Sequence, residues 1–363
     1  MDIILTISSV CTTWRTTALN LSGLWTNVLP PWTVDLEPER WENAQEHILH
    51  RLTPSRDRKL TVFLLEYTLI PPIFRLLSEN GSHLRVKKLH FSGNPYATDP
   101  VSLVVFPRVE ELNLEIWDLV QVHAFLRSYS RIKHLTLQCR VLQGRCSRTN
   151  GGSDLDAVQL PELDTLTIVN ATAEEQDNWL HILHPPKLRA LQLRTDASLP
   201  LNDSYWDRWD RRLVGNSRLP QTWPLTLHSR HVALLSIRKL VLGDWSARHQ
   251  TQYLLEGLPS VESLQLICPR PTRLDYVAAA LTDVNVLGQL VLAPKLEILS
   301  FHNGRFAYGK FERMLSARTS IGVQTLRKLR VSKVTLESAC GVYEYDMEVP
   351  DGIVLEHWQP PWV

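Results

Sequence analysis

The chain has 363 residues, of which 44% are hydrophobic and 21% are charged, and this is an ordinary globular composition. Its formal net charge is +1 without a long block of one sign, which argues against a surface dedicated to nucleic acid, because phosphate neutralisation needs clustered lysines and arginines. No apolar run reaches the roughly 18 residues that a membrane-spanning helix requires, so we expect neither nucleic acid nor a membrane among the partners.

The cysteines favour a reducing compartment. Five cysteines, odd in number and scattered along the chain, do not resemble a disulfide framework. The segment Met1 to Leu5 lacks a basic leader and a long apolar core, so it makes a poor signal peptide. We therefore expect an intracellular protein of the cytoplasm, the nucleus or both.

Residues 1 to 29 have the apolar spacing of a helix that ends near Gly23. On this pattern alone they predict a small helical cap. The run Val10-Cys11-Thr12-Thr13-Trp14-Arg15, followed by Leu24-Trp25-Thr26-Asn27-Val28, also resembles the second half of a fungal F-box domain. In that domain a Val-Cys-x-x-Trp-Arg helix precedes a Leu-Trp-x-x-Val segment.

The resemblance implies a docking role for five residues. Val10, Cys11 and Trp14 would pack within the box and against the Skp adaptor of a cullin-based ubiquitin ligase, and Leu24 and Trp25 would join the box to the rest of the chain. The simpler alternative is that all five form the core of an N-terminal cap. The Leu-Pro motif and further helix that open the family's box have no counterpart here, so we expect either a shortened F-box or a start upstream of Met1.

Residues 30 to 59 read as a linker and a helix. The helix is predicted over Trp41 to Leu52, where apolar residues share one side. Leu60 to Leu65 then reads as the first strand, and Leu69 to Leu77 as a helix that is entered through two prolines.

A six-residue phrase recurs through the remainder of the chain. It reads Val109-Glu110-Glu111-Leu112-Asn113-Leu114 in one copy, with apolar residues at the first, fourth and sixth places. The nine copies are centred on Leu89, Leu112, Leu135, Leu166, Leu191, Leu240, Leu264, Leu299 and Leu329. Their intervals range from 23 to 49 residues, and four of the eight lie between 23 and 25.

An interval of 20 to 29 residues is typical of leucine-rich repeats. In an extended segment Leu112 and Leu114 share one face while Glu111, Asn113 and Glu115 point outward. Helix-compatible stretches separate the copies, so each unit is a strand followed by a helix and cannot bury both faces alone. The fold class is therefore predicted as α/β, a leucine-rich-repeat solenoid over residues 60 to 363 with a curved parallel sheet, helices on the convex side and a short α-helical F-box remnant before it. Such a repeat array is the usual companion of an F-box.

Two insertions interrupt the period. Residues 144 to 156 form a polar, Gly-rich loop. Residues 195 to 236 form a longer insertion that contains Trp206, Arg208, Trp209 and Arg212. Because Trp and Arg dominate binding hot spots, we expect some of these four to contact a partner, with packing against the chain's own repeats as the alternative.

The outward positions of the strands form a mixed polar strip, acidic early and basic late, that suits a protein or peptide ligand by complementary charge. The alternative is a solvated surface without a ligand. The residues chosen from this strip are Glu111, Asn113, Glu115, His134, Gln138, Gln192, Arg194, Lys328 and Arg330. In the tail, Trp358 and Trp362 are expected to cap the open end of the repeats.

Signs of catalytic chemistry are weak. Three His-x-x-His pairs lack the Glu or Cys that would complete a zinc site, so no metal and no cofactor are expected. The run Gly304 to Lys310 fits Gly-x-x-x-x-Gly-Lys, but Phe311 replaces the Ser or Thr that holds magnesium, and we interpret Gly304 as a turn after its repeat strand. Asn303, shortly after its strand, is expected to hydrogen-bond the backbone in a turn, as are Cys139, Asn170 and Cys268.

The sequence thus predicts a non-catalytic substrate-recognition subunit of a Skp-cullin-F-box ubiquitin ligase, with the Skp adaptor and a target protein as partners. A repeat scaffold that binds proteins without ligase docking is the alternative. A nucleotide-dependent enzyme that uses Lys310 is a third possibility, and it requires nucleotide binding that disappears in Lys310→Ala.

Overall fold

The structure is a computed structural model of the whole chain. It describes residues 16–17, 26–28, 38–55, 57–64, 70–91, 106–116, 119–139, 156–171, 179–180, 182–194, 236–243, 254–284, 289–320, 326–338, 341–344, 350 and 352–360. The chain divides into two compact units, which are described one at a time. Unit 1 comprises Met1–Leu163 with Ile182–His184, and unit 2 comprises Asp164–His181 with Pro185–Val363.

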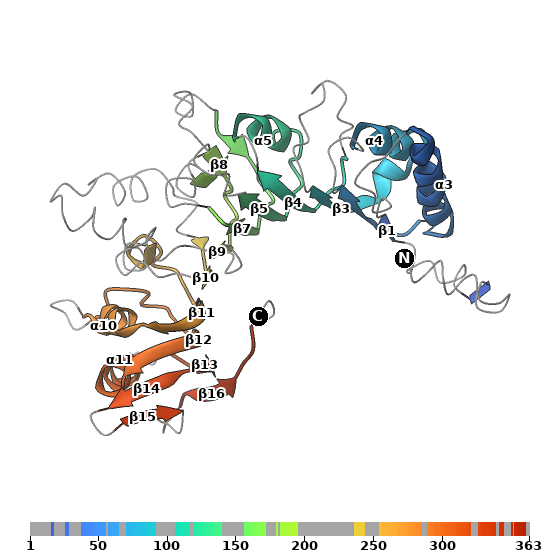
Figure 1. The fold of residues 1–363 in the computed structure, drawn as a ribbon. Helices are drawn as coiled ribbons and strands as arrows, with labels where there is room; N and C mark the ends of the chain where they lie inside the picture. The colour runs from blue at the N-terminus through green and yellow to red at the C-terminus, as the bar shows by residue number, and fades with distance from the viewer. Residues whose placement is uncertain are drawn as a thin grey trace, which may run out of the picture. The chain divides into compact units, whose positions relative to one another are not determined.

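Unit 1 is a parallel sheet with helices on one side (Figure 1). Its elements are β1 (Asn27–Val28), α3 (Pro38–Ser55), β2 (Leu60–Leu64), α4 (Ile70–Glu79), the 3₁₀ helix η3 (Ser82–Arg85), β3 (Val86–Phe91), β4 (Glu111–Ile116), α5 (Leu119–Leu126), β5 (His134–Cys139), β6 (Val158–Gln159) and β8 (Leu183–His184). Strands β1 to β5 pair in chain order, each parallel to the next. The short strands β6 and β8 form a separate parallel pair.

The core of unit 1 is aromatic. Phe74 of α4 meets Phe91 of β3 edge to face at 5.9 Å between ring centroids, and Phe106 at 4.7 Å. Phe91 in turn meets Phe125 of α5 at 5.3 Å. All four rings are at most 4% exposed, so they tie the two helices to the sheet through the edge-to-face geometry that aromatic pairs prefer.

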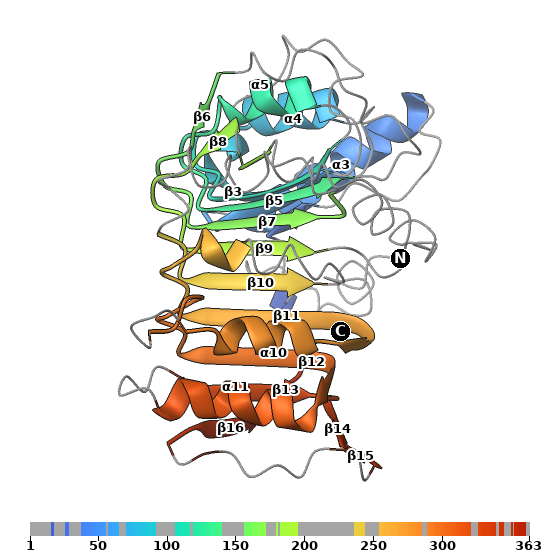
Figure 2. The same ribbon diagram turned by 90° about the vertical axis from the view of Figure 1, so that its left-hand side faces the viewer.

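Unit 2 is also α/β and built on a parallel sheet (Figure 2). Its elements are β7 (Thr165–Val169), β9 (Ala190–Arg194), β10 (Lys239–Gly243), β11 (Ser263–Arg273), α10 (Asp275–Thr282), β12 (Ile298–Ala307), α11 (Tyr308–Ser320), β13 (Lys328–Ser332), β14 (Thr335–Ser338), β15 (Gly341–Glu344) and β16 (Val354–His357). The strand order is β7-β9-β10-β11-β12-β13-β16, with β14 beside the far end of β12 and β15 antiparallel to β14. Helices α10 and α11 cover one face of this sheet.

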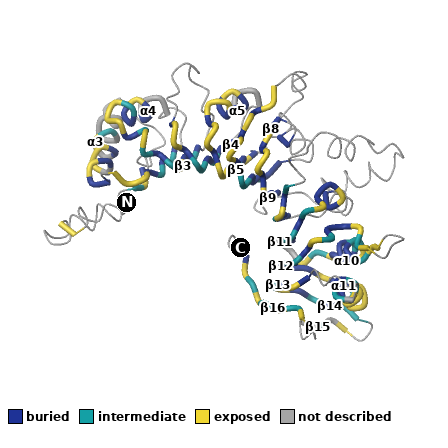
Figure 3. The backbone as a smooth tube through the Cα atoms, turned by 180° about the vertical axis from the view of Figure 1, so that it is seen from behind, coloured by how far each residue is buried: buried dark blue, intermediate teal, exposed yellow. Residues whose placement is uncertain are grey.

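The leucines of the repeated phrase pair in register. In unit 1, Leu89 lies opposite Leu112, and Leu112 opposite Leu135. In unit 2 the same row is Leu166, Leu191, Leu240, Leu264, Leu299, Leu329 and Leu355. The nine leucines at the centres of the predicted phrase are at most 1% exposed, whereas Leu355 is half-buried, and buried residues lie in both the strands and the helices (Figure 3). The prediction that the phrase marks parallel strands with a shared buried face is confirmed within each unit.

A second regularity is found at the start of β5, β9, β10, β11, β12 and β13. The residue just before each of these strands donates its N–H to a carbonyl of the neighbouring repeat, and the first strand residue donates to the same carbonyl. Arg238 and Lys239 thus share the oxygen of Arg189, at 2.8 and 3.0 Å, and Glu262 and Ser263 share that of Arg238, at 2.8 and 2.9 Å. Before β4, Glu110 donates in the same way to the carbonyl of Lys87, at 2.9 Å. We call these positions the edge row, which consists of Lys87, Glu110 and Lys133 in unit 1 and Asp164, Arg189, Arg238, Glu262, Glu297 and Arg327 in unit 2.

Two expectations about local structure were wrong. The strand predicted over Leu60 to Leu65 is present as β2, but it is not the first strand, because β1 precedes it and pairs with it, Val28 opposite Val62. Gly304 is not a turn, because β12 continues through it to Ala307.

The tail contains a strand that was not predicted, and Trp362, one of the two tryptophans expected to cap the repeats, lies outside the described residues. Residues Val354–His357 form β16, which adds a parallel strand next to β13, and the N–H of Trp358 donates to the carbonyl of Val331 at 3.1 Å. Leu355 lies 26 residues after Leu329, an interval that fits the repeat. The copy was missed because Gly352 and His357 stand where the phrase has its first and last apolar residues.

Arg318 is a charged side chain in the core of unit 2. Arg318 of α11 is 1% exposed. Its guanidinium donates to three carbonyl oxygens, those of Leu281 at 3.0 Å, Leu292 at 2.7 Å and Ala293 at 2.7 Å. Ala293 has a φ of 45°, so Arg318 ties the end of α10 to a turn in the left-handed region. Burial lowers the pKa of Arg318 to about 10, which leaves the guanidinium protonated at neutral pH.

Candidate functional site

The candidate site is the face of each sheet opposite the buried leucines. We call it the open face, and it carries the side chains that alternate with the core leucines along the strands. In unit 1 it holds Lys88, Glu111 and His134 in one row and His90, Asn113 and Thr136 in the next. In unit 2 the matching rows include Lys239, Ser263 and Lys328, and Gln192, Gln265, Ser300, Arg330 and Glu356.

In unit 1 the open face is polar but partly neutralised. Lys88 and Glu111 form an ion pair at 2.5 Å across β3 and β4. His90 stacks on Phe63 at 4.5 Å between ring centroids, with planes 8° apart. Burial, opposed by the charge of Glu111, lowers the pKa of His90, so this imidazole is neutral at pH 7.

Accessibility differs among the residues chosen in unit 1. His134 and Gln138 are exposed, and Glu111 and Asn113 are half-buried. Glu115 is only 6% exposed, which contradicts the expectation that it points into solvent. A ligand on this face would therefore reach His134 and Gln138 first.

In unit 2 the expected basic end is balanced by an acid that was not predicted. Glu356 of β16 accepts from Lys328 at 2.6 Å and from Arg330 at 2.9 Å. The hydrogen bonds from Lys328 and Arg330 hold the pKa of Glu356 below its ordinary value. Gln192 and Arg194, on β9, are half-buried. The open face of unit 2 is consequently less basic than the sequence of β13 alone predicts.

Part of the open face of unit 2 is buried. Val241, Gln265, Ser300 and His302 are all at most 6% exposed, although they alternate with the core leucines. The Nδ1 atom of His302 is 3.0 Å from the hydroxyl of Ser332, and burial lowers the pKa of the imidazole. The expectation of a continuous solvent-facing strip is therefore wrong for β10 to β12.

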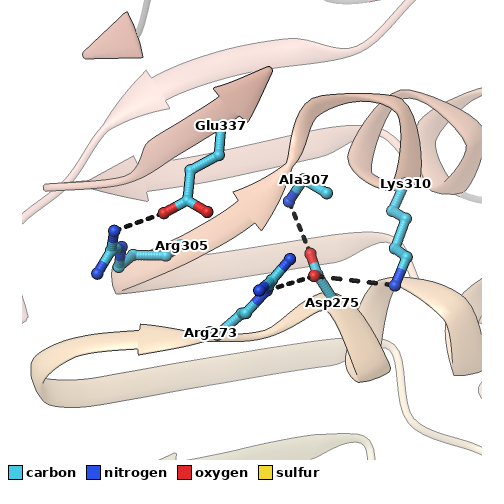
Figure 4. Close-up of polar contacts among 6 residues, drawn as sticks. All are labelled: Arg273, Asp275, Arg305, Ala307, Lys310 and Glu337. Atoms are coloured by element: carbon cyan, nitrogen blue, oxygen red, sulfur yellow. Dashed lines mark hydrogen bonds and ion pairs between the residues drawn. The ribbon is translucent and has the colours of Figure 1, made fainter. Parts of the chain in front are cut away.

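The nucleotide alternative depends on the stretch from Gly304 to Lys310. Figure 4 shows Ala307 and Lys310 of this stretch beside Asp275. Strand β12 ends at Ala307 and α11 begins at Tyr308, so no loop separates them that could surround a phosphate. A Cβ on Gly304 would lie 2.9 Å from the ring of Phe306 and 3.1 Å from Leu274, so close packing explains this glycine. Lys310 lies 3.8 Å from the carboxylate of Asp275.

Asp275 is the centre of this cluster. Its Oδ1 accepts from the N–H of Ala307 at 2.6 Å, and its Oδ2 from Nε of Arg273 at 2.7 Å. Burial raises the pKa of Asp275, but the bonds from Ala307 and Arg273 and the nearby positive charges outweigh it, so the pKa lies below its ordinary value. The carboxylate ties α10 to the junction of β12 and α11. Lys310 therefore has a structural partner, which weakens the case for a nucleotide site.

The structure bears on the expectations about metal and cysteine chemistry only for the residues that it describes. Among the described residues no group of three potential metal ligands comes together. Cys139 and Cys268 are buried and form no disulfide. Asn303 has a φ of 55°, and its Nδ2 donates to the carbonyl of Cys268 at 2.9 Å. The expected hydrogen bond to the backbone is confirmed, but Asn303 lies within β12 and not in a turn.

Nine of the predicted site residues lie outside the part of the chain that the structure describes. They are Val10, Cys11, Trp14, Leu24 and Trp25 in the F-box-like segment, and Trp206, Arg208, Trp209 and Arg212 in the long insertion. Their roles stay predictions.

No protein-family model and no curated protein matches the chain. The described helices include none with the length and apolar character needed to span a bilayer. The open face and the edge row are therefore characterised by their residues, distances and charges alone. Sequence reasoning missed Glu356 and Asp275 because each acts through partners from other strands or helices, and no local pattern marks such pairs.

Proposed function

We propose that the chain is a leucine-rich-repeat protein that binds other proteins without catalysing a reaction. The in-register leucines of each unit support this proposal, since stacked repeats bury the same apolar row in every copy. The edge-row carbonyls that each accept two N–H groups are a further feature that recurs in several repeats. The proposed solenoid has a curved sheet with the open face on its concave side.

We further propose that it is a substrate-recognition adaptor of a Skp-cullin-F-box ubiquitin ligase. The observation that carries this proposal is the position of β1. Asn27 and Val28 end the segment that resembles an F-box, and they pair in parallel with Thr61 and Val62 of β2. An adaptor-bound box would thus continue directly into the repeat sheet, which favours a fixed presentation of a bound target.

The mechanism is proximity. Val10, Cys11 and Trp14 would contact the Skp adaptor, Leu24 and Trp25 would connect the box to the sheet, and exposed groups of the open face such as His134 and Gln138 would hold the target. The long insertion, through Trp206 and Arg208 with Trp209 and Arg212, would add contacts. No residue of this chain is assigned a bond-breaking step.

A pull-down with purified Skp adaptor tests the proposal. We expect the full chain to retain the adaptor, and the double variant Val10→Asp with Trp14→Ala to lose it, because an acid and a truncated indole cannot pack in an apolar contact. Trp358→Ala, at the opposite end of the sequence, is the matched control and should retain the adaptor. Failure of both the chain and a version extended upstream of Met1 to bind would contradict adaptor function.

The second candidate is a repeat scaffold without ligase docking, which the ion-paired polar rows of the open face support equally. Under this alternative a target protein is retained, while the adaptor is not. The single variants Lys88→Glu and Glu111→Lys should each weaken target binding, and the double variant, which restores the ion pair with its charges exchanged, should restore binding. Identical capture of the target by all three variants would exclude this part of the open face.

A further inference from the structure

A small cavity opens at the amino-terminal edge of strands β9, β10 and β11 in unit 2. Its volume is about 270 Å³. The residues around it come from two rows of successive repeats, namely Lys187, Ser236, Ser260 and Lys295 in one row and Arg189, Arg238 and Glu262 in the edge row. Four cations thus face a single acid.

In unit 2 the edge row places like charges side by side, Arg189 next to Arg238 and Glu262 next to Glu297. In unit 1, Glu110 stands between Lys87 and Lys133 and forms ion pairs with both, so opposite charges alternate. In unit 2, Arg189 and Arg238 are direct neighbours, since the N–H of Arg238 donates to the carbonyl of Arg189 at 2.8 Å. Two like charges on adjacent strands repel each other unless an anion lies between or beside them.

The arginines keep donors for such an anion. Arg189 pairs with Asp164 at 3.7 Å and Arg238 with Glu262 at 3.5 Å, both longer than the 2.7–2.9 Å of a charge-assisted hydrogen bond. Their side chains are 73% and 65% exposed, so each guanidinium, with its five N–H groups, can turn toward a ligand. Lys187 and Lys295 are exposed on the same rim.

We propose that this cavity binds a tetrahedral oxyanion, namely the phosphate group. The planar forks of Arg189 and Arg238 match two phosphate oxygens each, Lys187 and Lys295 add point charges, and the hydroxyl of Ser260 lies beside the site. The cavity is shallow and its lining is polar, which disfavours an apolar ligand, and it has room for a phosphate group. The proposal does not depend on the proposed ligase function.

Phosphate binding by the full chain can be measured with inorganic phosphate at constant ionic strength, by isothermal titration calorimetry and the line width of the ³¹P NMR signal. We expect the double variant Arg189→Gln with Arg238→Gln to lower the association constant at least about tenfold, because two charge-assisted contacts are lost. Arg327→Gln is the matched control, since it removes an arginine from the same row where an acid is its neighbour. Its affinity for phosphate should equal that of the wild type.

The site is disproved if the wild-type chain does not broaden the phosphate signal, or if the folded double variant binds phosphate as tightly as the wild type. Should the double variant lose its circular dichroism spectrum, Lys187→Gln with Lys295→Gln replaces it, since both lysines are exposed. This second variant should bind at least about threefold more weakly, because two charges near the anion are removed. Unchanged binding by it would overturn the proposal.

The source of the phosphate group is decided by a second series with short peptides. A phosphoserine peptide that binds more tightly than inorganic phosphate, while its unphosphorylated form does not bind, assigns the site to phosphorylated proteins. Equal affinity for inorganic phosphate and the phosphopeptide assigns it to a small free anion. Inorganic phosphate and the phosphopeptide should both bind more weakly to the Arg189→Gln, Arg238→Gln variant. A ligand whose affinity does not change in this variant binds elsewhere.

Discussion

The interior charge of Arg318 is balanced by main-chain carbonyl oxygens. Arg318→Ala removes three hydrogen bonds at once and leaves the buried carbonyls of Leu281, Leu292 and Ala293 without these donors. We expect the free energy of unfolding to fall by about 3 kcal/mol or more, because a buried unsatisfied polar group costs about 1–3 kcal/mol. Urea denaturation measures this change.

Arg313 offers the control on the same helix. It is exposed, and its Nε donates to the carbonyl of Gly309 within α11 at 2.9 Å. Arg313→Ala should therefore alter stability by about 0.5 kcal/mol or less. Arg318→Lys should fall between the two, because an ammonium cannot span three carbonyls in the geometry of a planar fork. Equal stability of Arg318→Ala and Arg313→Ala would contradict the anchoring role.

Asp275 predicts a dependence of stability on pH. Because its pKa in the folded chain is lower than the ordinary value of 3.8, the carboxylate stabilises the fold fully above pH 3.8. This contribution is lost as the pH falls through the lower folded pKa. Asp275→Asn, which cannot carry the charge, should cost about 1–3 kcal/mol at pH 7, and the difference from the wild type should shrink as the pH falls below 3.8. Urea midpoints at a series of pH values test this, and a difference independent of pH would exclude the carboxylate's charge as the cause.

Single residues near turns were predicted with mixed success. Asn303 was identified correctly because a short polar side chain that tolerates positive φ, placed just past the repeated phrase, has a local reason to bond the backbone. Gly304 was misread because a glycine after a strand usually marks a turn. Here the glycine is required by Phe306 and Leu274, which come close from two places in the chain, and the sequence gives no local sign of that approach.

Among the elements, β16 is joined to its neighbour by side-chain charge as well as by backbone pairing. Its neighbours on β13 are Lys328 and Arg330, and Glu356 is the acid between them. Glu356→Lys would place a third positive charge in this row, and we expect β16 to detach locally. Hydrogen exchange should then be faster at the amides of Val354 and Trp358, which donate to the carbonyls of Arg327 and Val331.

Strand β4 is the internal control for this experiment. Because it lies in unit 1, its amides should keep the wild-type exchange rate in Glu356→Lys. Glu356→Gln keeps the shape of the side chain and removes only the charge, so its exchange should be intermediate. Unchanged exchange at Val354 in Glu356→Lys would show that backbone pairing alone holds the strand.

Elements that carry the repeated phrase were predictable from the sequence, because an apolar/x/x/Leu/x/Leu pattern has one face to bury wherever it occurs. β1 and β16 were harder. β1 is described over two residues, Asn27 and Val28, too few for a pattern, and β16 lacks the final apolar residue of the phrase at His357. In both cases parallel pairing with a neighbouring strand, which the local sequence does not encode, completes the sheet.

At the scale of the whole molecule, the leucine row predicts that a substitution in one strand also destabilises the adjacent strands. Leu240 is fully buried and lies between Leu191 and Leu264. Leu240→Ala should cost about 2–5 kcal/mol, and hydrogen exchange should accelerate in β9 and β11 as well as in β10, since each repeat contacts its neighbours. Lys239→Ala, one residue earlier on the open face, should change stability by about 0.5 kcal/mol or less. Exchange that rises in β10 alone would contradict nearest-neighbour coupling.

The doubly used carbonyl of Arg189 has a consequence for how such a chain can change length. Leu191 and Leu240 are 49 residues apart, about twice the interval of the regular copies, yet their strands pair without a shift, and Arg238 and Lys239 both bond the same oxygen. The alignment of successive strands is thus uncoupled from the amount of polypeptide that joins them. Duplication or deletion of genetic material between two copies of the phrase would change the connecting segment on the surface and leave the pairing of the parallel strands as it was.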